Sequence, residues 1–250
     1  MTGSSLWLLP PKDHPLHKIL TTLLHETLPT RFPREAASSP RVVPHFFPTH
    51  ITLTNGIVPE STYGADEGGA QGGAQAWLDS IPFPSSSSSS TTDTAGGDGE
   101  GKGVKVKVRF EKVVSQDVFY RRCYVKVGFE GVKELAGVAR AVGVLGEGVD
   151  VNAESGEVKF GEKTEAWLSS WQEEFGPHLS LMYGNEPVLD GAVREVRRVL
   201  EDAGLRLSES EIETVEGAGG FDGWDGGVIW LVPTDKPISE WGTPIATREL

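Results

Sequence analysis

The chain contains little cysteine and no long apolar run. Cys123 is the single cysteine among 250 residues, so no intramolecular disulfide can form and we expect a reducing, intracellular setting. No apolar stretch approaches the length of a bilayer crossing, so we expect no membrane span. The apolar residues 6–9 are followed by two prolines and have no basic flank, so we expect no signal peptide.

Positive charge is also scarce. The chain has 23 Lys and Arg against 36 Asp and Glu, which gives a net charge of −13. A groove for long nucleic acid needs a basic stripe, so we expect no such partner. A small anionic ligand held by a few local donors is still compatible with this charge. The length suits one domain with a sizeable core, and we expect a monomer.

Two stretches lack side chains large enough to bury. Residues 85–103 are mostly Ser, Gly and Thr, and residues 61–76 are rich in Gly, Ala and Gln. Such segments cannot offset the entropy lost on ordering. The segments on either side of 85–103 have the patterns of neighbouring strands. We therefore predict a flexible insertion in a surface loop of a single domain spanning 1–250.

Hydrophobic periodicity predicts strands and helices in mixed order. We predict a first helix capped by Asp13 and ended by Pro29 and Pro33, and a later helix capped by Asp190 and ended by Gly204. Further helices are predicted over residues 133–144 and 164–175, and strands over 5–9, 104–114, 118–129, 212–215 and 227–232. The residues after 232 give no clear pattern. Hairpin pairs mixed with helices indicate the α+β class.

One strand carries a histidine and two hydroxyls on a single face. Residues 44–58 read P-H-F-F-P-T-H-I-T-L-T-N-G-I-V. Because side chains alternate along a strand, His50, Thr52 and Thr54 point one way and the apolar residues between them point the other. The apolar face can be buried in the core, which leaves the histidine and hydroxyls on the opposite side.

The same pattern returns in the second half of the chain. Residues 175–184 read F-G-P-H-L-S-L-M-Y-G, which puts His178 and Ser180 on one face. A proline again precedes the histidine, and a hydroxyl again follows two positions later. Either histidine alone would be read as structural, but its recurrence in the same frame favours function. We expect the fold to bring the two strands together.

Two opposed histidines can carry out acid–base chemistry without a metal. An imidazole with a pKa near ~6.5 can give or take a proton at cellular pH. One can deprotonate a water while the other protonates the leaving oxygen. With Thr52 and Ser180 beside them, the pair forms a phosphate cradle that needs no cofactor. The favoured substrate is a phosphodiester whose leaving group stays attached, such as a ribose cyclic phosphate.

The motifs T-H-I-T-L-T at 49–54 and P-H-L-S-L-M-Y-G at 177–184 resemble the paired H-x-[T/S]-x motifs of the two-histidine (2H) phosphoesterase superfamily. The opening S-L-W-L-L-P-P and the later W-L-V-P-T-D are similar to the fungal and plant 2′,3′-cyclic-nucleotide 3′-phosphodiesterases. The resemblance covers most of the chain outside the insertion. It implies a bilobal α+β fold with two antiparallel sheets facing across a central groove and helices on the outside.

The resemblance also implies an activity. It is metal-independent hydrolysis of nucleoside 2′,3′-cyclic phosphates to 2′-phosphates, with ADP-ribose 1″,2″-cyclic phosphate from tRNA splicing as a further substrate. The implied roles are His178 as base, His50 as acid, and Thr52 and Ser180 as binders of the non-bridging oxygens. Geometry alone does not fix which histidine is the acid. Tyr183 offers a ring for base stacking. The resemblance implies a cytoplasmic location, with Golgi association as in the fungal family.

Two other functions stay open at this point. The chain could process cyclic phosphates at RNA ends, although its negative charge disfavours that, or it could bind a nucleotide without turnover. Arg121, Arg122 and Lys126 provide cations on the strand predicted over 118–129, where alternation puts Arg121 on the opposite face from the other two. Any of them could reach a phosphate, although two adjacent arginines most often form a solvated edge. His45 is a further candidate beside the first motif.

Overall fold

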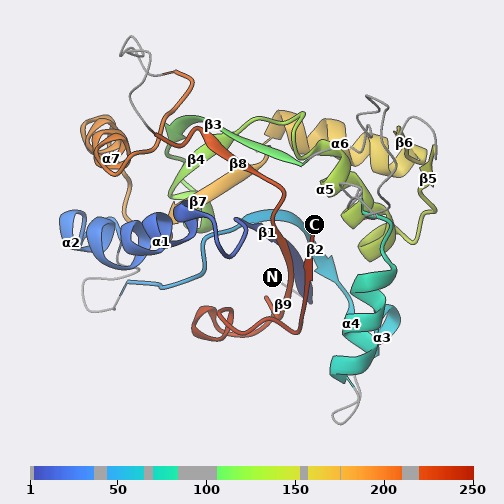
Figure 1. Ribbon diagram of the computed structural model, residues 1–250. Coiled ribbons are helices and arrows are strands. Elements are labelled where there is room, and N and C mark those ends of the chain that lie inside the picture. The colour runs from blue at the N-terminus through green and yellow to red at the C-terminus, as the bar shows by residue number, and fades with distance from the viewer. Residues whose placement is uncertain are drawn as a thin grey trace, which may run out of the picture.

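The strands of the protein form one curled antiparallel sheet (Figure 1). The computed structural model describes residues 3–36, 44–64, 70–83, 106–152, 157–174, 176–209 and 220–250. Within these ranges the sheet has eight strands. In sheet order they are β10 (Ala246–Glu249), β9 (Val228–Val232), β1 (Ser4–Leu9), β2 (Ile51–Ile57), β7 (His178–Met182), β4 (Cys123–Val127), β3 (Lys107–Val114) and β8 (Gly223–Asp225). A separate hairpin consists of β5 (Asp150–Val151) and β6 (Val158–Lys159).

Helices lie along the outside of this sheet. They are α1 (Pro15–Thr22), the π-helical turn η1 (Leu23–Thr27), α2 (Leu28–Arg31), α3 (Pro59–Thr62), α4 (Ala70–Ser80), α5 (Lys133–Arg140), the π-helical turn η3 (Ala141–Leu145), α6 (Glu162–Glu174) and α7 (Asp190–Asp202). Two 3₁₀ turns are η2 (Phe119–Arg121) and η4 (Ile238–Glu240). Helix α5 packs on β2, α7 on β3 and α4 on β10. The predicted α+β class is therefore confirmed.

The two histidine-bearing strands meet at the middle of the sheet. Strands β2 and β7 are joined by one residue pair, Ile51 with Leu179. On either side the ladders are longer, between β1 and β2 and between β4 and β7. The sheet thus has two four-stranded halves that share one short seam. The expected arrangement of two separate facing sheets is not confirmed, because β2 and β7 pair through their backbones and join the strands into one sheet.

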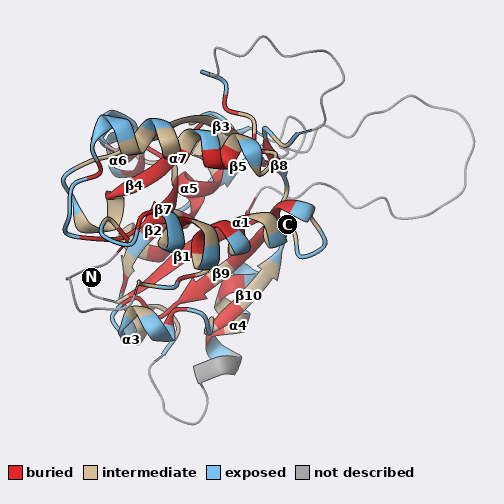
Figure 2. Ribbon diagram, turned by 90° about the vertical axis from the view of Figure 1, so that its left-hand side faces the viewer, coloured by how far each residue is buried: buried red, intermediate tan, exposed pale blue. Residues whose placement is uncertain are grey.

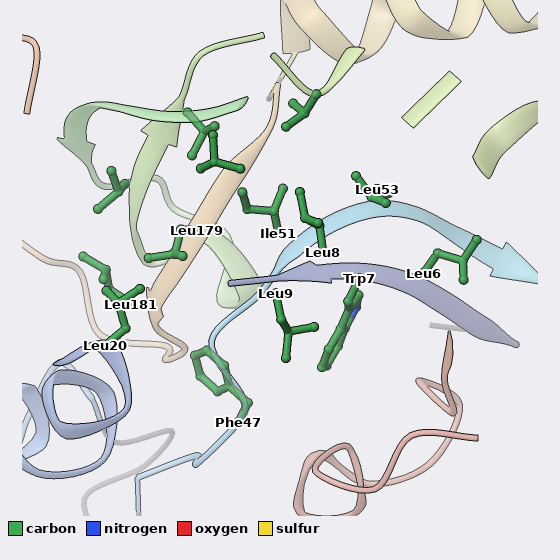
Figure 3. Packing of buried hydrophobic residues seen from close by; sticks show 14 of the residues in the cluster. Leu6, Trp7, Leu8, Leu9, Leu20, Phe47, Ile51, Leu53, Leu179 and Leu181 are labelled. Atoms are coloured by element: carbon green, nitrogen blue, oxygen red, sulfur yellow. The ribbon is translucent and has the colours of Figure 1, made fainter. Parts of the chain in front are cut away.

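Alternation along the strands divides the core from the opposite face. Ile51, Leu53 and Leu179 are fully buried on the helix-covered side, and the buried residues follow the sheet strands through the molecule (Figure 2). Trp7 points away from Leu8, to the other side of β1 (Figure 3). The sheet can therefore bury an apolar face under helices and still present polar and aromatic groups on its other face.

The ends of the first helix differ from the prediction. Its N-cap is His14 and not Asp13, because the His14 Nδ1 accepts a hydrogen bond from the Leu16 N–H at 3.2 Å. The chain also stays helical past Pro29 to Arg31. The π-helical turn η1 shifts the register so that Pro29 falls in the first turn of α2, where its missing N–H is tolerated.

The N-cap predicted for the later helix and the strand predicted over 118–129 also differ from the structure. Leu189, and not Asp190, is the N-cap of α7, and Asp190 contributes its charge to the first turn instead, where it suits the helix dipole. Gly204 follows the helix with φ +92°, as the predicted stop requires. In the predicted strand 118–129, residues 119–121 form a 3₁₀ turn, so the strand begins only at Cys123.

The structure confirms several of the remaining helix and strand predictions and contradicts one prediction of a flexible stretch. The helices over 133–144 and 164–175 are confirmed as α5 with η3 and as α6, and the strands over 5–9 and 227–232 as β1 and β9. Residues 70–76 of the stretch predicted to be flexible are helical, in α4. The predicted insertion 85–103 and strand 212–215 lie outside the described residues. No helix in the described ranges is long and apolar enough to cross a membrane.

Candidate active site

Both motif histidines line one cavity of about 280 Å³. The cavity lies on the face of the sheet opposite the helix-covered core and is bordered by residues of β1, β2, β7, η2 and α6. Thr52 and Ser180 line it together with His50 and His178. The expectation that the fold brings the two motifs together is therefore confirmed.

His50 lies immediately before β2, and its ring contacts one backbone carbonyl oxygen and two aromatic rings. Its Nδ1 is 2.6 Å from the Pro48 carbonyl oxygen. Because a carbonyl can only accept, Nδ1 carries the hydrogen and Nε2 is left for the cavity. The ring stacks on Trp7 with centroids 3.5 Å apart and meets the Phe47 ring edge-on at 5.9 Å. Burial lowers the pKa of His50 to about 3, and the charge of His178 adds to this shift while the Pro48 bond opposes it.

His178 repeats this arrangement at the start of β7. Its Nδ1 is 3.1 Å from the carbonyl oxygen of Gly176, so its Nε2 is again the nitrogen available to the cavity. The Tyr124 ring lies beside it, with centroids 5.0 Å apart. Burial lowers the pKa of His178 to about 4, with the charge of Arg121 adding to the effect. Burial thus keeps each imidazole neutral, and a carbonyl two residues earlier holds both in the same tautomer.

The two hydroxyls differ in their surroundings. Thr52 is partly exposed in the cavity, whereas Ser180 is buried. The Ser180 Oγ can donate its hydrogen to the Tyr120 carbonyl oxygen at 3.4 Å or to the Tyr183 hydroxyl, whose pKa this bond lowers. Both neighbours orient the second motif hydroxyl.

Tyr183 lines the cavity but is itself almost fully buried. One face of its ring stacks on Phe47, with centroids 3.9 Å apart and planes 17° apart. Burial raises the pKa of Tyr183 well above the ordinary value for tyrosine, while the bond with Ser180 opposes this rise, so the hydroxyl keeps its proton. What the structure shows for this residue is a bond to Ser180 and a packed ring.

The three candidate cations have different positions. Arg121 lines the cavity. Arg122 is buried, and it donates from Nε to the Gly184 carbonyl oxygen and pairs with Asp117 at 2.8 Å. Lys126 pairs with a glutamate of β3 at 3.2 Å. The 3₁₀ turn η2 breaks the strand alternation, which is why Arg121 reaches the cavity face.

Several lining residues were not predicted as site residues. They are Ser5 and Trp7 of β1, Trp167 and Trp171 of α6, and Thr234 and Trp241 near the C-terminus. The Ser5 Oγ lies 2.7 Å from the Thr234 Oγ1, and Thr234 donates to the Gly3 carbonyl oxygen. The strings S-L-W-L-L-P-P and W-L-V-P-T-D contain Ser5, Trp7 and Thr234, so these strings carried a usable signal. His45 is absent from the described cavity lining.

The described residues contain no cluster of three or more His, Cys, Asp or Glu side chains placed to hold a metal ion. Outside the cavity, the histidines at 14 and 17 lie at the start of α1, where His14 caps the helix. The polar side chains that line the described cavity are two imidazoles, several hydroxyls, the Asn55 amide, indole N–H groups and one guanidinium.

The burial of the two imidazoles predicts a pH-dependent stability. Their pKa values of about 3 and about 4 lie below the unfolded value of ~6.5, so this stability is complete above pH ~6.5 and is lost as the pH falls toward the folded values. Each histidine adds a slope of at most about 1.4 kcal/mol per pH unit. Urea unfolding between pH 7 and pH 4 will show a shallower slope in His50→Gln and in His178→Gln than in the wild type. Parallel curves for all three chains would contradict the burial argument.

Comparison with known proteins identifies close relatives. Residues 1–250 match the family described as "Cyclic phosphodiesterase-like protein". A protein of Neurospora crassa named "2',3'-cyclic-nucleotide 3'-phosphodiesterase" is 47% identical over 252 residues, which cover 100% of both chains. A protein of the same name from Phaeosphaeria nodorum is 37% identical over 254 residues, again covering 100% of both chains.

Proposed function

Because the chain belongs to the cyclic phosphodiesterase-like protein family, we propose that it hydrolyses nucleoside 2′,3′-cyclic phosphates to nucleoside 2′-phosphates. One observation carries the proposal: two imidazoles of the same tautomer, from distant parts of the chain, line a single cavity. The names of the two fungal relatives support the same reaction.

The proposed reaction is an in-line displacement at phosphorus. The Nε2 of His178 takes a proton from a water as the water oxygen forms its bond to phosphorus. The P–O3′ bond breaks, and Nε2 of His50 gives its proton to O3′. The product keeps its phosphate on O2′. Proton exchange with solvent then returns both imidazoles to their starting states.

Binding of the substrate phosphate makes one imidazole take up a proton from solvent and become the acid. Both imidazoles are neutral in the free protein because burial lowers their pKa values. An anionic phosphate placed between them favours the charged form and raises those pKa values again. Binding of substrate therefore loads one imidazole with the proton that the leaving oxygen needs, while the other stays neutral to act on water.

The hydroxyls complete the proposed phosphate site. Thr52 and Ser180 donate to the non-bridging oxygens, and for this the Ser180 hydrogen turns from the Tyr120 carbonyl oxygen and the Tyr183 hydroxyl toward the phosphate. Base stacking by Tyr183 stays a prediction, and it would have to use the ring face that Phe47 does not cover. The two halves of the sheet correspond in this view to two lobes, each of which brings one histidine and one hydroxyl.

The second substrate and the location proposed for this protein come from the resemblance of its two motifs to those of the 2H phosphoesterases. ADP-ribose 1″,2″-cyclic phosphate, a by-product of tRNA splicing, is proposed as a second substrate that carries the same cyclic diester. A monomeric state is likewise proposed and remains a prediction. A cytoplasmic location, with Golgi association, remains a prediction.

A product assay tests the proposed function. Incubation with a nucleoside 2′,3′-cyclic phosphate will give the 2′-phosphate alone, because the proposed acid protonates O3′. EDTA will leave the rate unchanged, since the proton transfers are assigned to histidines. Phosphorus NMR distinguishes the two phosphate isomers.

Three outcomes would contradict the proposal. Formation of the 3′-phosphate would reject the assigned leaving group, and loss of the rate in EDTA would reject the metal-independent mechanism. A short oligoribonucleotide with a cyclic end serves as the competing substrate. If it is hydrolysed with a much higher kcat/KM than the mononucleotide, the protein processes RNA ends instead.

A further inference from the structure

Arg121 lies on a turn that is fixed at the border of the cavity. Its backbone N–H donates to the Val118 carbonyl oxygen at 2.9 Å, and its carbonyl accepts from the Gln116 N–H at 3.2 Å. The turn η2 leads directly into β4, which pairs with the His178 strand. The guanidinium is therefore carried by a backbone that is bonded on both sides and is anchored to the catalytic half of the sheet.

The charge of Arg121 is unusual for its surroundings. Of the described residues that line the cavity, it alone carries a permanent charge. None of those described residues is a carboxylate, although the whole chain has a net charge of −13. A phosphodiester that enters the cavity thus meets one fixed positive charge, which matches its own single negative charge.

Arg121 acts on the two imidazoles unequally. Burial lowers the pKa of His178 and the charge of Arg121 adds to this, whereas at Tyr124 the same charge opposes the rise in pKa that burial causes. At His50 burial and the charge of His178 lower the pKa, and the Pro48 bond opposes them. Because the turn that carries Arg121 leads into β4, the partner of the His178 strand, its charge acts on the His178 side of the cavity and breaks the symmetry of an otherwise matched histidine pair.

The other charged groups around His178 do not provide this asymmetry. Lys126 lies opposite His178 in the β4–β7 register, but its ammonium pairs with Glu111 of β3 at 3.2 Å. Tyr124 contributes a ring from β4, and β2 contributes the second imidazole. Arg121 is the cation of this group that lines the cavity itself.

We propose that Arg121 binds a non-bridging oxygen of the substrate phosphate and, by its position, keeps His178 as the neutral, water-activating member of the pair. This inference rests on the proposed function and adds a residue and an assignment to it. The phosphate charge acts on both imidazoles, but Arg121 opposes that effect only at His178, so the proton resides on His50. The guanidinium also meets the second negative charge that develops on phosphorus during attack by water, so it stabilises the transition state more than the bound substrate.

The test compares Arg121→Gln with Lys126→Gln, which removes a cation from the same segment without changing the cavity lining. Arg121→Gln will lower kcat/KM by about 100-fold, the usual effect of losing one donor to a developing oxyanion. Arg121→Lys will recover part of the rate because it keeps the charge but loses the planar fork. Lys126→Gln will stay close to wild type. Circular dichroism checks that each variant is folded.

The pH profile separates a positioning role from a purely structural one. Without the guanidinium the pKa of His178 will rise, so the acidic limb of kcat/KM in Arg121→Gln will move to higher pH. Lys126→Gln will leave that limb in place. A folded Arg121→Gln with wild-type kcat/KM, or with an unmoved limb, would overturn the inference and leave the proposed function intact.

Binding provides a readout that does not depend on turnover. Calorimetry with a nucleoside 2′-monophosphate will show weaker binding to Arg121→Gln than to wild type or Lys126→Gln. If the wild type does not hydrolyse the cyclic substrate, the proposed function fails, and the calorimetry still decides whether Arg121 holds a phosphate. Equal affinities in the three chains would overturn the inference.

Discussion

Alanine at His50 or at His178 will lower kcat for a nucleoside 2′,3′-cyclic phosphate by about 10²- to 10⁴-fold, because each change removes one proton-transfer group from the cavity. The double variant will be little slower than the slower single variant, since both groups act in the same displacement. Initial rates at saturating substrate measure the effect. Activity of the folded double variant near the wild-type level would end the two-histidine mechanism.

His45→Ala is the matched control for these variants. His45 lies close to His50 in sequence, but the structure places its ring against Phe119, edge-on at 5.5 Å, outside the cavity lining. Its removal will therefore leave kcat near the wild-type value. Thermal unfolding of each chain shows whether a low rate reflects lost chemistry or lost structure.

A sulfur-substituted substrate distinguishes the acid from the base. A cyclic phosphorothiolate with sulfur in place of O3′ has a leaving group that needs no protonation. His50→Ala will recover much of its rate with this substrate, whereas His178→Ala will not, because the water still needs a base. The opposite pattern would exchange the two roles.

Trp7→Ala will have the largest effect on stability. Trp7 is 1% exposed, stacks on the His50 ring and meets Trp241 edge-on with centroids 5.7 Å apart. Loss of a fully buried tryptophan costs about 3–5 kcal/mol of unfolding free energy. For a chain of this size, that corresponds to a fall in Tm of about 2–4 °C for each kcal/mol. Urea and thermal unfolding measure both quantities.

Trp7→Ala will also lower kcat, because His50 loses the ring that holds its plane. Trp7→Phe keeps an aromatic face against the imidazole and will retain more of both stability and rate. Trp230→Ala is the control, since Trp230 lies directly opposite Trp7 on β9 but is only partly buried. A loss below about 1 kcal/mol in Trp7→Ala, within the range typical of minor substitutions, would show that the stack contributes little.

Sequence patterns predicted the features that depend on local periodicity. Alternation around His50 and His178 gave the face of each motif residue correctly, because a strand has a fixed period of two. The helices α5, α6 and α7 followed from apolar spacing in the same way. The common cavity of the two motifs was expected from their repeated frame, and the structure confirms it.

The parts that local patterns missed depend on contacts between distant residues or on small backbone shifts. Trp241 reaches the cavity from a tail with no periodicity, and Trp7 does so because β1 pairs with β2. Arg121 was placed by strand alternation, but a single 3₁₀ turn changed its direction. His14 replaced Asp13 as the cap because an imidazole nitrogen can accept the same backbone hydrogen bond as a carboxylate.

The short seam between β2 and β7 has a consequence for turnover. Because one residue pair joins the two strands, few backbone hydrogen bonds resist a small tilt of one half of the sheet against the other. Such a tilt would change the spacing of the two imidazole nitrogens that face the cavity, since each half carries one of them. In the proposed reaction, a phosphate bound to the hydroxyls of both strands bridges the halves and fixes that spacing. When the product leaves, the bridge is lost, and the next substrate to bind restores it.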